Sequence, residues 1–409
     1  MAIKAHKIRL NPTPEQEAYF WRAAGTRRFA FNWGLAEWRR QYEAGEKPSA
    51  MKLKEQFNAI RQEQFPWTYD VTKCAIEGAF FDLGDAFTRF FDGQKKGRKI
   101  GYPRFKSKKR CRASFYLSND KFTVGAHWVQ VPVLGDFVVT QREALTQAKV
   151  TKRARVKKQV GRVNLAESLR FSGKILGATI GRTGGYWFLS IQVEVVQEVP
   201  SNTAPPVGID VGISRLATLS DGREVENQHP LRRKLQKVAH LSRELARRTK
   251  GGKNWDQTKL KLTRLHYHIA CVRDDILHKL TTDIAQRYGL VGVEDLHLKG
   301  LFKNHCLAQA LSDVSLGRLL KLLEGKVPAH GGKLVKVGRF FPSSQLCHCC
   351  GTRKTDLTLG DRIFRCPNVA CGYVGDRDFN AAQNILHEAV RLVGVAEHLR
   401  VPGSGYDGT

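Results

Sequence analysis

Residues 207–213 read VGIDVGI, a short apolar run with one acidic residue at its centre. Alternation along a strand puts the branched side chains on one face and Asp210 on the other, between Gly208 and Gly212. We expect these glycines to leave free space beside the carboxylate, which suits a metal ion and an approaching phosphodiester backbone. An acidic residue that simply ends an edge strand is the alternative interpretation of this fragment.

Two further acids stand at comparable positions downstream. Glu294 ends the apolar run LVGVE, where an ionised group is costly to bury unless it is paired or binds a metal ion. In GDRDFNAAQNIL, Asp376 suits a helix N-cap and Asp378 falls in the first helical turn, so Asp378 is the better ligand candidate. A strand Asp, a strand-end Glu and a helix Asp provide the oxygen ligands that two-metal phosphodiester cleavage requires. The sequence therefore predicts Asp210, Glu294 and Asp378 as catalytic Mg²⁺ ligands, with Asp376 as the alternative third acid.

Five of the nine cysteines lie within residues 347–371, in the runs CHCC and CPNVAC, each followed by glycine. Tetrahedral zinc takes four thiolates, usually from two tight turns, and the spacing between the runs suits a small β-ribbon. A redox role for the CxxC pair is the alternative, but no thioredoxin-like βαβ pattern surrounds it. We expect structural zinc, with Cys349 as a spare thiol and these ligands: Cys347, Cys350, Cys366 and Cys371.

The C-terminal half of the chain has mixed helix and strand signals. Two prolines close the polar linker SNTAPP, so we expect a domain boundary near residue 204. Apolar spacing then predicts a helical hairpin that turns at Gly251 and Gly252, a strand, a helix over 311–324, a second strand and a final helix over 377–393.

The N-terminal half begins with the strand AIKAHKIRL and continues with an amphipathic helix. A further helix is expected over about 71–91, followed by the basic loop GQKKGRKIGYPRFKSKKR. Residues 113–196 are rich in strand signals, with a hairpin at Gly184 and Gly185. The basic run at 149–158 has no apolar periodicity and is interpreted as a solvated loop that could touch phosphate.

The net charge of +30 is larger than solubility requires and indicates a polyanionic partner. No stretch approaches the length of an apolar membrane span, and the start MAIKAHKIRL lacks the apolar region of a signal peptide, so the cytosol is expected. Clustered rather than scattered cysteines favour metal over disulfides.

The order GIDVG, VGVEDL, SSQLCHCCG with RCPNVACG, and DRDFNAAQNIL resembles the RuvC-like nuclease core of the TnpB (OrfB) family, which is encoded by insertion sequences and related to type V CRISPR effectors. KIRLNPTPEQ and YPRFKSKKR resemble the same family, so the likeness covers essentially the whole chain. Three features depart from the family pattern: the extra Cys349, the wider second cysteine pair and an apparent insertion at 142–160.

The resemblance implies an α/β multidomain protein with an RNase H-like (RuvC) nuclease domain, an inserted zinc knuckle, and an N-terminal wedge β-barrel with an inserted helical recognition domain. The expected bounds are 1–10 and 113–203 for the wedge, 11–112 for the recognition domain, 204–340 and 375–395 for the nuclease, 341–374 for the knuckle, and 396–409 for a tail.

The resemblance also implies a guide RNA from the element's own transcript, a double-stranded DNA target and a short DNA motif beside it. No motif fixes the residues that contact nucleic acid, so the candidates come only from their neighbourhood in the sequence. They are Thr72, Lys73, Tyr102, Arg104, Lys106, Ser118, Asn119, Arg232 and Arg233.

We expect an RNA-guided DNA endonuclease that hydrolyses phosphodiesters with two Mg²⁺ ions. A non-catalytic RNA-binding protein is one alternative, although the three intact acids argue against it. An autonomous transposase is the other, but His266 and His268 lie two residues apart in a predicted helix and point away from each other, so they do not form a nickase pair.

Overall fold

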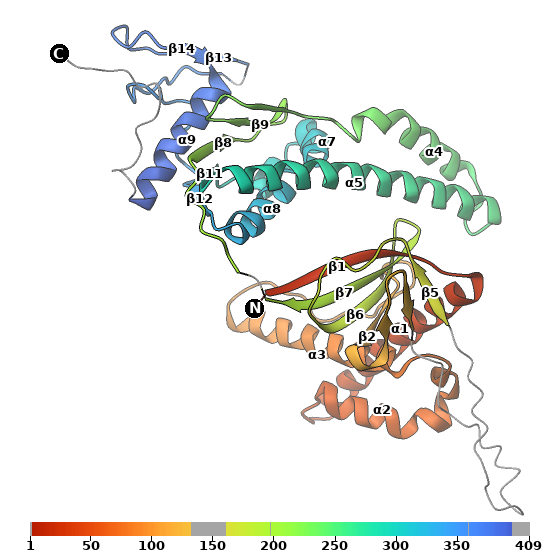
Figure 1. The fold of residues 1–409 in the computed structure, drawn as a ribbon. Coiled ribbons are helices and arrows are strands. Elements are labelled where there is room, and N and C mark those ends of the chain that lie inside the picture. Colours follow the sequence, from red (N-terminus) through yellow and green to blue (C-terminus); the bar gives the residue numbers. More distant parts are fainter. Residues whose placement is uncertain (1, 132–160, 197, 359, 395–409) are drawn as a thin grey trace, which may run out of the picture. The chain divides into compact units, whose positions relative to one another are not determined.

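The computed structural model describes residues 2–131, 161–196, 198–358 and 360–394, and it divides into two compact units, Met1–Gln197 and Glu198–Thr409 (Figure 1). The predicted basic loop at 149–158, the apparent insertion at 142–160 and the tail at 396–409 lie outside the described residues. Among the described helices, none has the length and hydropathy needed to cross a membrane.

The first unit contains a seven-stranded antiparallel sheet in the order β2-β6-β7-β1-β5-β4-β3. The predicted hairpin is confirmed, and Gly184 and Gly185 turn it with φ values of 61° and 83°. The strands are β1 Ala2–Asn11, β2 Ser114–Ser118, β3 Thr123–Val124, β4 Trp128–Gln130, β5 Arg162–Leu165, β6 Lys174–Thr183 and β7 Tyr186–Val195.

Helices cover one face of this sheet. Thr13 caps α1 in a capping box, because its side chain accepts from the Gln16 backbone while the Gln16 side chain accepts from the Thr13 backbone. Phe20 of α1 packs on Phe115 and Trp187 of the sheet, with ring centroids 5.9 and 5.2 Å apart. The helices are α1 Pro14–Glu43, α2 Ala50–Gln64, the 3₁₀ turn η1 Pro66–Asp70, and α3 Lys73–Lys95.

Helix α2 is an element that the sequence pattern did not predict. Its buried residues are Leu53, Phe57 and Arg61, and it packs with α1 and α3 around a second aromatic cluster. The basic segment after α3 is confirmed as a loop, since no helix or strand lies between the end of α3 at Lys95 and the start of β2 at Ser114.

The second unit contains a five-stranded sheet in the order β10-β9-β8-β11-β12. Strands β8, β11 and β12 run parallel, while β9 and β10 are antiparallel additions at one side. The strands are β8 Pro206–Asp210, β9 Arg215–Leu219, β10 Glu224–Glu226, β11 Leu290–Glu294 and β12 Lys333–Val337.

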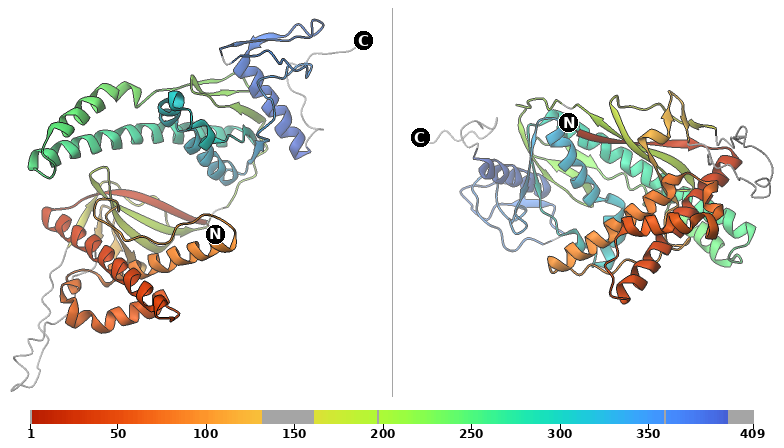
Figure 2. Two further views of the ribbon diagram at one scale, coloured as in Figure 1. Left: turned by 180° about the vertical axis from the view of Figure 1, so that it is seen from behind. Right: turned by 90° about the horizontal axis from the view of Figure 1, so that it is seen from below.

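Two layers of helices enclose this sheet (Figures 1 and 2). Helices α5 and α8 cover the face that carries Val207 and Ile209, and α9 lies on the opposite face against β8 and β11. The helices are η4 Arg232–Lys234, α4 Leu235–Arg247, α5 Lys253–Arg287, α6 Leu298–Leu301, α7 His305–Val314, α8 Leu316–Ala329 and α9 Arg377–Val393.

The predicted hairpin of α4 and α5 and the predicted bounds of α9 are confirmed. The single helix predicted over 311–324 is wrong, because Ser315 adopts the left-handed conformation with φ 57° and separates α7 from α8. A short ribbon, β13 Ile363–Arg365 with β14 Val374–Asp376, precedes α9.

Candidate active site

The three predicted catalytic acids lie on the wall of one cavity of about 910 Å³ in the second unit. Asp210 is the last residue of β8 and Glu294 is the last residue of β11. These strands are adjacent and parallel, with Ile209 opposite Val293, so the two carboxylates emerge at the same edge of the sheet. Asp378, in the first turn of α9, completes the set.

Helix α9 reaches the site because glycines in the sheet allow its backbone to approach. A Cβ on Gly208 would lie 2.1 Å from the Ala382 carbonyl oxygen, and one on Gly292 would lie 2.7 Å from the Ala389 Cβ. The expectation that Gly208 leaves free space for a metal ion is therefore wrong. Its missing side chain is filled by α9, and this close packing carries Asp378 toward Asp210.

The surroundings of Asp210 disfavour its ionised form. Burial, followed by the negative charges of Glu294 and Asp378, raises the pKa of Asp210 to about 8. The Arg377 guanidinium opposes this shift only in part. Concentrated negative charge at a poorly solvated edge favours the binding of cations.

Glu294 is held by a residue outside the predicted site. The hydroxyl of Ser343 donates a hydrogen bond to a Glu294 carboxylate oxygen. The side-chain amide of Asn384, on α9, donates to the Ser343 carbonyl oxygen at 2.8 Å and to the Leu346 carbonyl oxygen at 2.7 Å. The segment that reaches Glu294 is thus fastened to the helix that carries Asp378.

The alternative acid, Asp376, has a different set of contacts. It caps α9 by accepting from the backbone of Asp378 at 2.9 Å and of Phe379 at 3.0 Å. Arg215, on β9, forms an ion pair with it at 2.8 Å and lies 4.0 Å from Asp378. The pKa of Asp376 is lowered because the Arg215 interaction and these backbone hydrogen bonds outweigh its burial. Asp376 therefore caps α9, as the sequence predicted, and it also pairs with Arg215, which the sequence did not predict.

The described carboxylates do not form a closed site for a single ion. Among the described residues, the four cysteines are the only group of three or more His, Cys, Asp or Glu side chains whose ligand atoms lie close enough to share one ion. An open arrangement of three acids is compatible with metal ions that also take water and phosphate oxygens as ligands.

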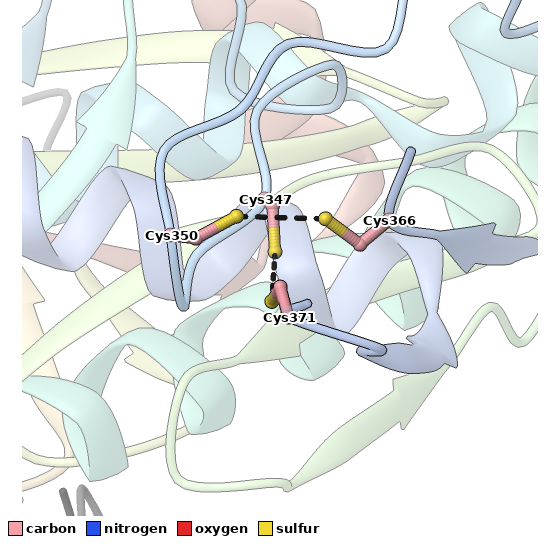
Figure 3. Close-up of side chains that lie close together, drawn as sticks. All are labelled: Cys347, Cys350, Cys366 and Cys371. Atoms are coloured by element: carbon pink, nitrogen blue, oxygen red, sulfur yellow. Dashed lines mark hydrogen bonds between the residues drawn. The ribbon is translucent and has the colours of Figure 1, made fainter. Parts of the chain in front are cut away.

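The four predicted zinc ligands come together beside the turn that joins β13 to β14 (Figure 3). Their sulfur atoms all lie within 4.8 Å of one another, with 3.8 Å between those of Cys347 and Cys371 and 3.5 Å between those of Cys350 and Cys366. In a tetrahedral site with bonds of about 2.3 Å, the sulfurs are about 3.8 Å apart. The cluster is consistent with zinc.

The fifth thiol lies outside this cluster. Cys349 is exposed, and its sulfur lies 3.4 Å from Nε2 of His348. The backbone N–H of His348 donates to the side-chain oxygen of Asn380, on α9, at 3.0 Å, and Asn380 donates to the Leu346 carbonyl oxygen at 2.6 Å. The cysteine loop is therefore attached to α9 by two asparagines one turn apart, a spacing visible in NAAQN but not interpreted from the sequence.

Several of the candidate nucleic-acid contacts already have structural roles. Thr72 is only 5% exposed and caps α3, with its own backbone N–H donating to the Tyr19 hydroxyl at 3.1 Å. Lys106 pairs with Asp82 at 2.9 Å and lies over the Phe31 ring. The contacts of Lys106 fix the basic loop against the helices. The side chains of Thr72 and Lys106 are therefore both engaged within the protein.

The other candidates are accessible to different degrees. Tyr102, Arg104, Asn119 and Arg233 are exposed, Lys73 is exposed near Glu77, and Ser118 is half-buried. Arg232 lies on the wall of the large cavity that contains the acids. Its backbone N–H donates to the carboxylate of Asp313 at 3.1 Å, a buried residue that the sequence pattern did not single out.

Family models match three segments of the chain. One described as "Probable transposase" (OrfB_IS605) matches residues 190–305, one for the TNB domain of Cas12f1-like proteins matches 317–385, and a helix-turn-helix model of the OrfB_IS605 type matches 1–47. The described four-cysteine cluster falls within the TNB match.

Relatives match nearly the whole chain. A Streptomyces pristinaespiralis protein named "Putative RNA-guided DNA endonuclease" is 33% identical over 94% of this chain and 88% of its own length. An Escherichia coli K12 protein, "Putative RNA-guided DNA endonuclease InsQ", is 29% identical over 94% of this chain and 92% of its own length.

The mixed α/β fold has a counterpart of known structure. It resembles the protein in the cryo-EM structure of a Cas12f1-sgRNA-target DNA complex, with a TM-score of 0.55 at 14% identity over 94% of this chain and 98% of that one. Together with the family models and the extended sequence identity, this likeness establishes that the chain belongs to the OrfB (TnpB) family of IS605-type insertion sequences, which is related to Cas12f.

Proposed function

We propose that the protein is an RNA-guided DNA endonuclease in which Asp210, Glu294 and Asp378 hold two Mg²⁺ ions. The observation that carries the proposal is the convergence of these acids on one cavity at the ends of β8 and β11. The names of the relatives and the Cas12f1-like fold support a guide RNA and a DNA target as partners. Base pairing would then select the target, beside a short DNA motif.

The two units have corresponding assignments. The five-stranded sheet with α9 is a RuvC-like nuclease domain, supported by acids at the ends of two adjacent parallel strands and at the start of a packed helix. The cysteine ribbon is its structural zinc knuckle. The seven-stranded sheet of the first unit is the wedge domain, with α1, α2 and α3 as its helical recognition insert.

The acidic donor set fits Mg²⁺, which prefers carboxylate and water oxygens and usually keeps several waters. The pKa of Asp210, raised by burial and then by the negative charges of Glu294 and Asp378, supports the same assignment, because a cation would neutralise those charges. Bound Mg²⁺ ions would stabilise the negative charge that develops on the phosphate and activate the attacking water.

The chain's own residues orient these ligands. Ser343 fixes Glu294 by donating to its carboxylate, and Gly208 allows α9 to bring Asp378 close to Asp210. Arg362 and Arg377 also line the cavity, where their charges can attract the DNA backbone. Both acids on the strands are anchored by the sheet, so the ligand geometry is largely set before DNA arrives.

The experiment that tests the function starts from the protein purified with its bound RNA. Sequencing should return one dominant RNA species that ends in a variable guide segment. Replacing that segment should redirect Mg²⁺-dependent cleavage to a plasmid that carries the new complement. Heterogeneous cellular RNA, or cleavage that ignores the replaced guide, would contradict the proposal.

A further inference from the structure

The first unit contains a cavity of about 420 Å³ between α1 and η1, away from the acidic site in the sequence and in a different unit. Gly25 and Thr26 of α1, both small residues, line it together with Val71. A volume of this size accommodates a single small ligand.

Two arginines on α1, Arg22 and Arg28, border this cavity. Arg22 and Arg28 form no ion pair or side-chain hydrogen bond with the described part of the chain. The adjacent Arg27 behaves differently, because it donates to Asp82 at 2.6 Å and to the Ser114 hydroxyl at 2.7 Å. The two cavity arginines therefore have charges available for an anionic ligand, and they flank a concave surface rather than an open helix face.

A half-exposed tryptophan also lines the cavity. Trp67 is 46% exposed and meets Phe29 edge to face, with ring centroids 4.9 Å apart. Phe29 is itself braced by Phe65 at 4.9 Å. A large aromatic ring that remains accessible beside cations is the arrangement on which unpaired bases stack.

The turn that carries Trp67 is rigidly held. Arg61, only 7% exposed, donates to both the hydroxyl and the carbonyl oxygen of Thr68 at 2.8 Å, and its guanidinium lies 3.8 Å from the centroid of the Tyr69 ring. Thr68 in turn donates to the Phe65 carbonyl oxygen at 2.7 Å. Trp67 is thus exposed on a fixed support and not on a loose loop, which lowers the entropic cost of stacking a base on it.

We propose that this cavity binds one unstacked nucleotide of a nucleic-acid strand. The base stacks on Trp67, the phosphate lies against Arg22 and Arg28, and the carboxylate of Asp70, at the cavity wall, accepts a hydrogen bond from an exocyclic amino group of the base. The proposal rests on the proposed function only in taking a nucleic acid as the partner, and it requires neither cleavage nor the Mg²⁺ site.

Photo-crosslinking tests this site directly. Full-length protein is irradiated with single-stranded RNA or DNA that carries 5-iodocytosine, then digested with trypsin. Cleavage after Arg61 and Lys73 gives the peptide QEQFPWTYDVTK, which contains Trp67, and cleavage after Arg9 and Arg22 gives LNPTPEQEAYFWR, which contains Trp21. Trp21 is also exposed on α1, at 38%, but does not line the cavity, so it serves as an internal reference.

The expected result is a crosslink concentrated in the Trp67 peptide. Trp67→Ala should weaken oligonucleotide binding roughly 5- to 100-fold, and Trp67→Phe should retain most of it, because stacking accounts for the loss. Arg28→Gln should reduce the crosslink yield, whereas Lys52→Gln, which removes an equal charge from the exposed face of α2, should not. The nucleic acid that gives the higher yield identifies the strand that occupies the site.

Equal labelling of both tryptophan peptides, or a Trp67 crosslink unchanged by Arg28→Gln, would overturn the site. The side chain of Arg28 is only partly buried, so Arg28→Gln should fold normally. The proposal can therefore be tested even if Trp67→Ala fails to fold. Performing the assay also with Asp210→Asn protein separates this result from the proposed nuclease activity. A crosslink that persists without cleavage supports the nucleotide site whatever the outcome for the endonuclease.

Discussion

The hydroxyl of Ser343 donates a hydrogen bond to the carboxylate of Glu294, and this contact joins the segment before the cysteine cluster to the acidic cavity. The carbonyl oxygen of the same serine accepts from Asn384 of α9. Strand end, cysteine segment and helix are therefore linked through one residue. Disturbing either the serine or the cysteine ribbon should affect the acidic site.

Ser343→Ala should lower the rate of DNA cleavage by roughly tenfold, because a hydrogen bond to an ionised group is lost and Glu294 gains rotational freedom. Ser343→Thr keeps the hydroxyl and should restore most of the rate. The neighbouring Ser344, which lines the cavity without a recorded hydrogen bond in the described structure, is the matched control. Single-turnover rates measured over a range of Mg²⁺ concentrations check this, and equal rates for Ser343→Ala and Ser344→Ala would contradict a positioning role.

Gly208→Ala should destabilise the second unit by about 3 kcal/mol or more, since the added methyl group would overlap the α9 backbone at Ala382. Gly325→Ala is the control, because Gly325 lies on the exposed face of α8 and an added Cβ there meets nothing within 4 Å. That change should stabilise the protein by roughly 0.5–1 kcal/mol. Urea unfolding of both variants provides the comparison. An unchanged free energy of unfolding in Gly208→Ala would mean that α9 does not pack against Gly208 in this way.

The pKa of Asp210 predicts a pH dependence in Mg²⁺-free buffer. Its folded value, about 8, lies above the ordinary value of 3.8, so the protonated acid favours the folded state. This contribution is complete below pH 4 and is lost as the pH rises through 8, with a slope of at most about 1.4 kcal/mol per pH unit. Added Mg²⁺ should restore stability at the alkaline end.

The measurement compares urea unfolding of wild-type and Asp210→Asn protein between pH 5 and 8. Taking the difference between the two proteins removes the opposing contributions of histidines such as His387, whose pKa is lowered by burial. The stability advantage of Asp210→Asn should grow with pH. A constant difference would contradict the raised pKa of Asp210.

The cysteine cluster should hold one zinc ion per chain. Cys366→Ser should release it and lower the melting temperature, because metal binding contributes directly to the folding of such small ribbons. Cys349→Ser should change neither the zinc content nor the melting temperature, since that thiol lies outside the cluster. Metal analysis by mass spectrometry together with thermal unfolding tests both variants. Retained zinc in Cys366→Ser would exclude that residue as a ligand.

Features carried by local pattern were predictable from the sequence. The spacing of the four cysteines predicts their cluster. The position of Asp376 before an amphipathic run predicts its role as a helix cap. Glu294 could be identified because it ends an apolar stretch, and Asp210 because it is the one acid inside an apolar run. Their convergence on one cavity depends on the parallel pairing of β8 with β11. This pairing joins strands that are far apart in the sequence, so local pattern does not predict it.

Other features arise from tertiary packing and leave little trace in local pattern. The sequence suggested that Gly208 leaves space for a metal ion, whereas helix α9, which lies far along the chain, packs against it. Ser315 gives no sign in the sequence that it breaks one apolar helix into two. Thr72 resembles an exposed polar residue until its capping of α3 and the Tyr19 contact are seen. In each case a distant element decides the role of the residue.

The central claim is that the acids on this cavity perform the cleavage, and a neighbouring pair of acids tests it most directly. Glu294 lines the cavity, whereas the adjacent Asp295 does not line it and pairs with Arg339 at 2.7 Å. With RNA-loaded protein and guide-matched DNA, Glu294→Gln, Asp210→Asn and Asp378→Asn should each lose nearly all cleavage but keep their RNA, and Asp295→Asn should cut at close to the wild-type rate. Cleavage retained by Glu294→Gln, or lost equally in Asp295→Asn, would contradict the account.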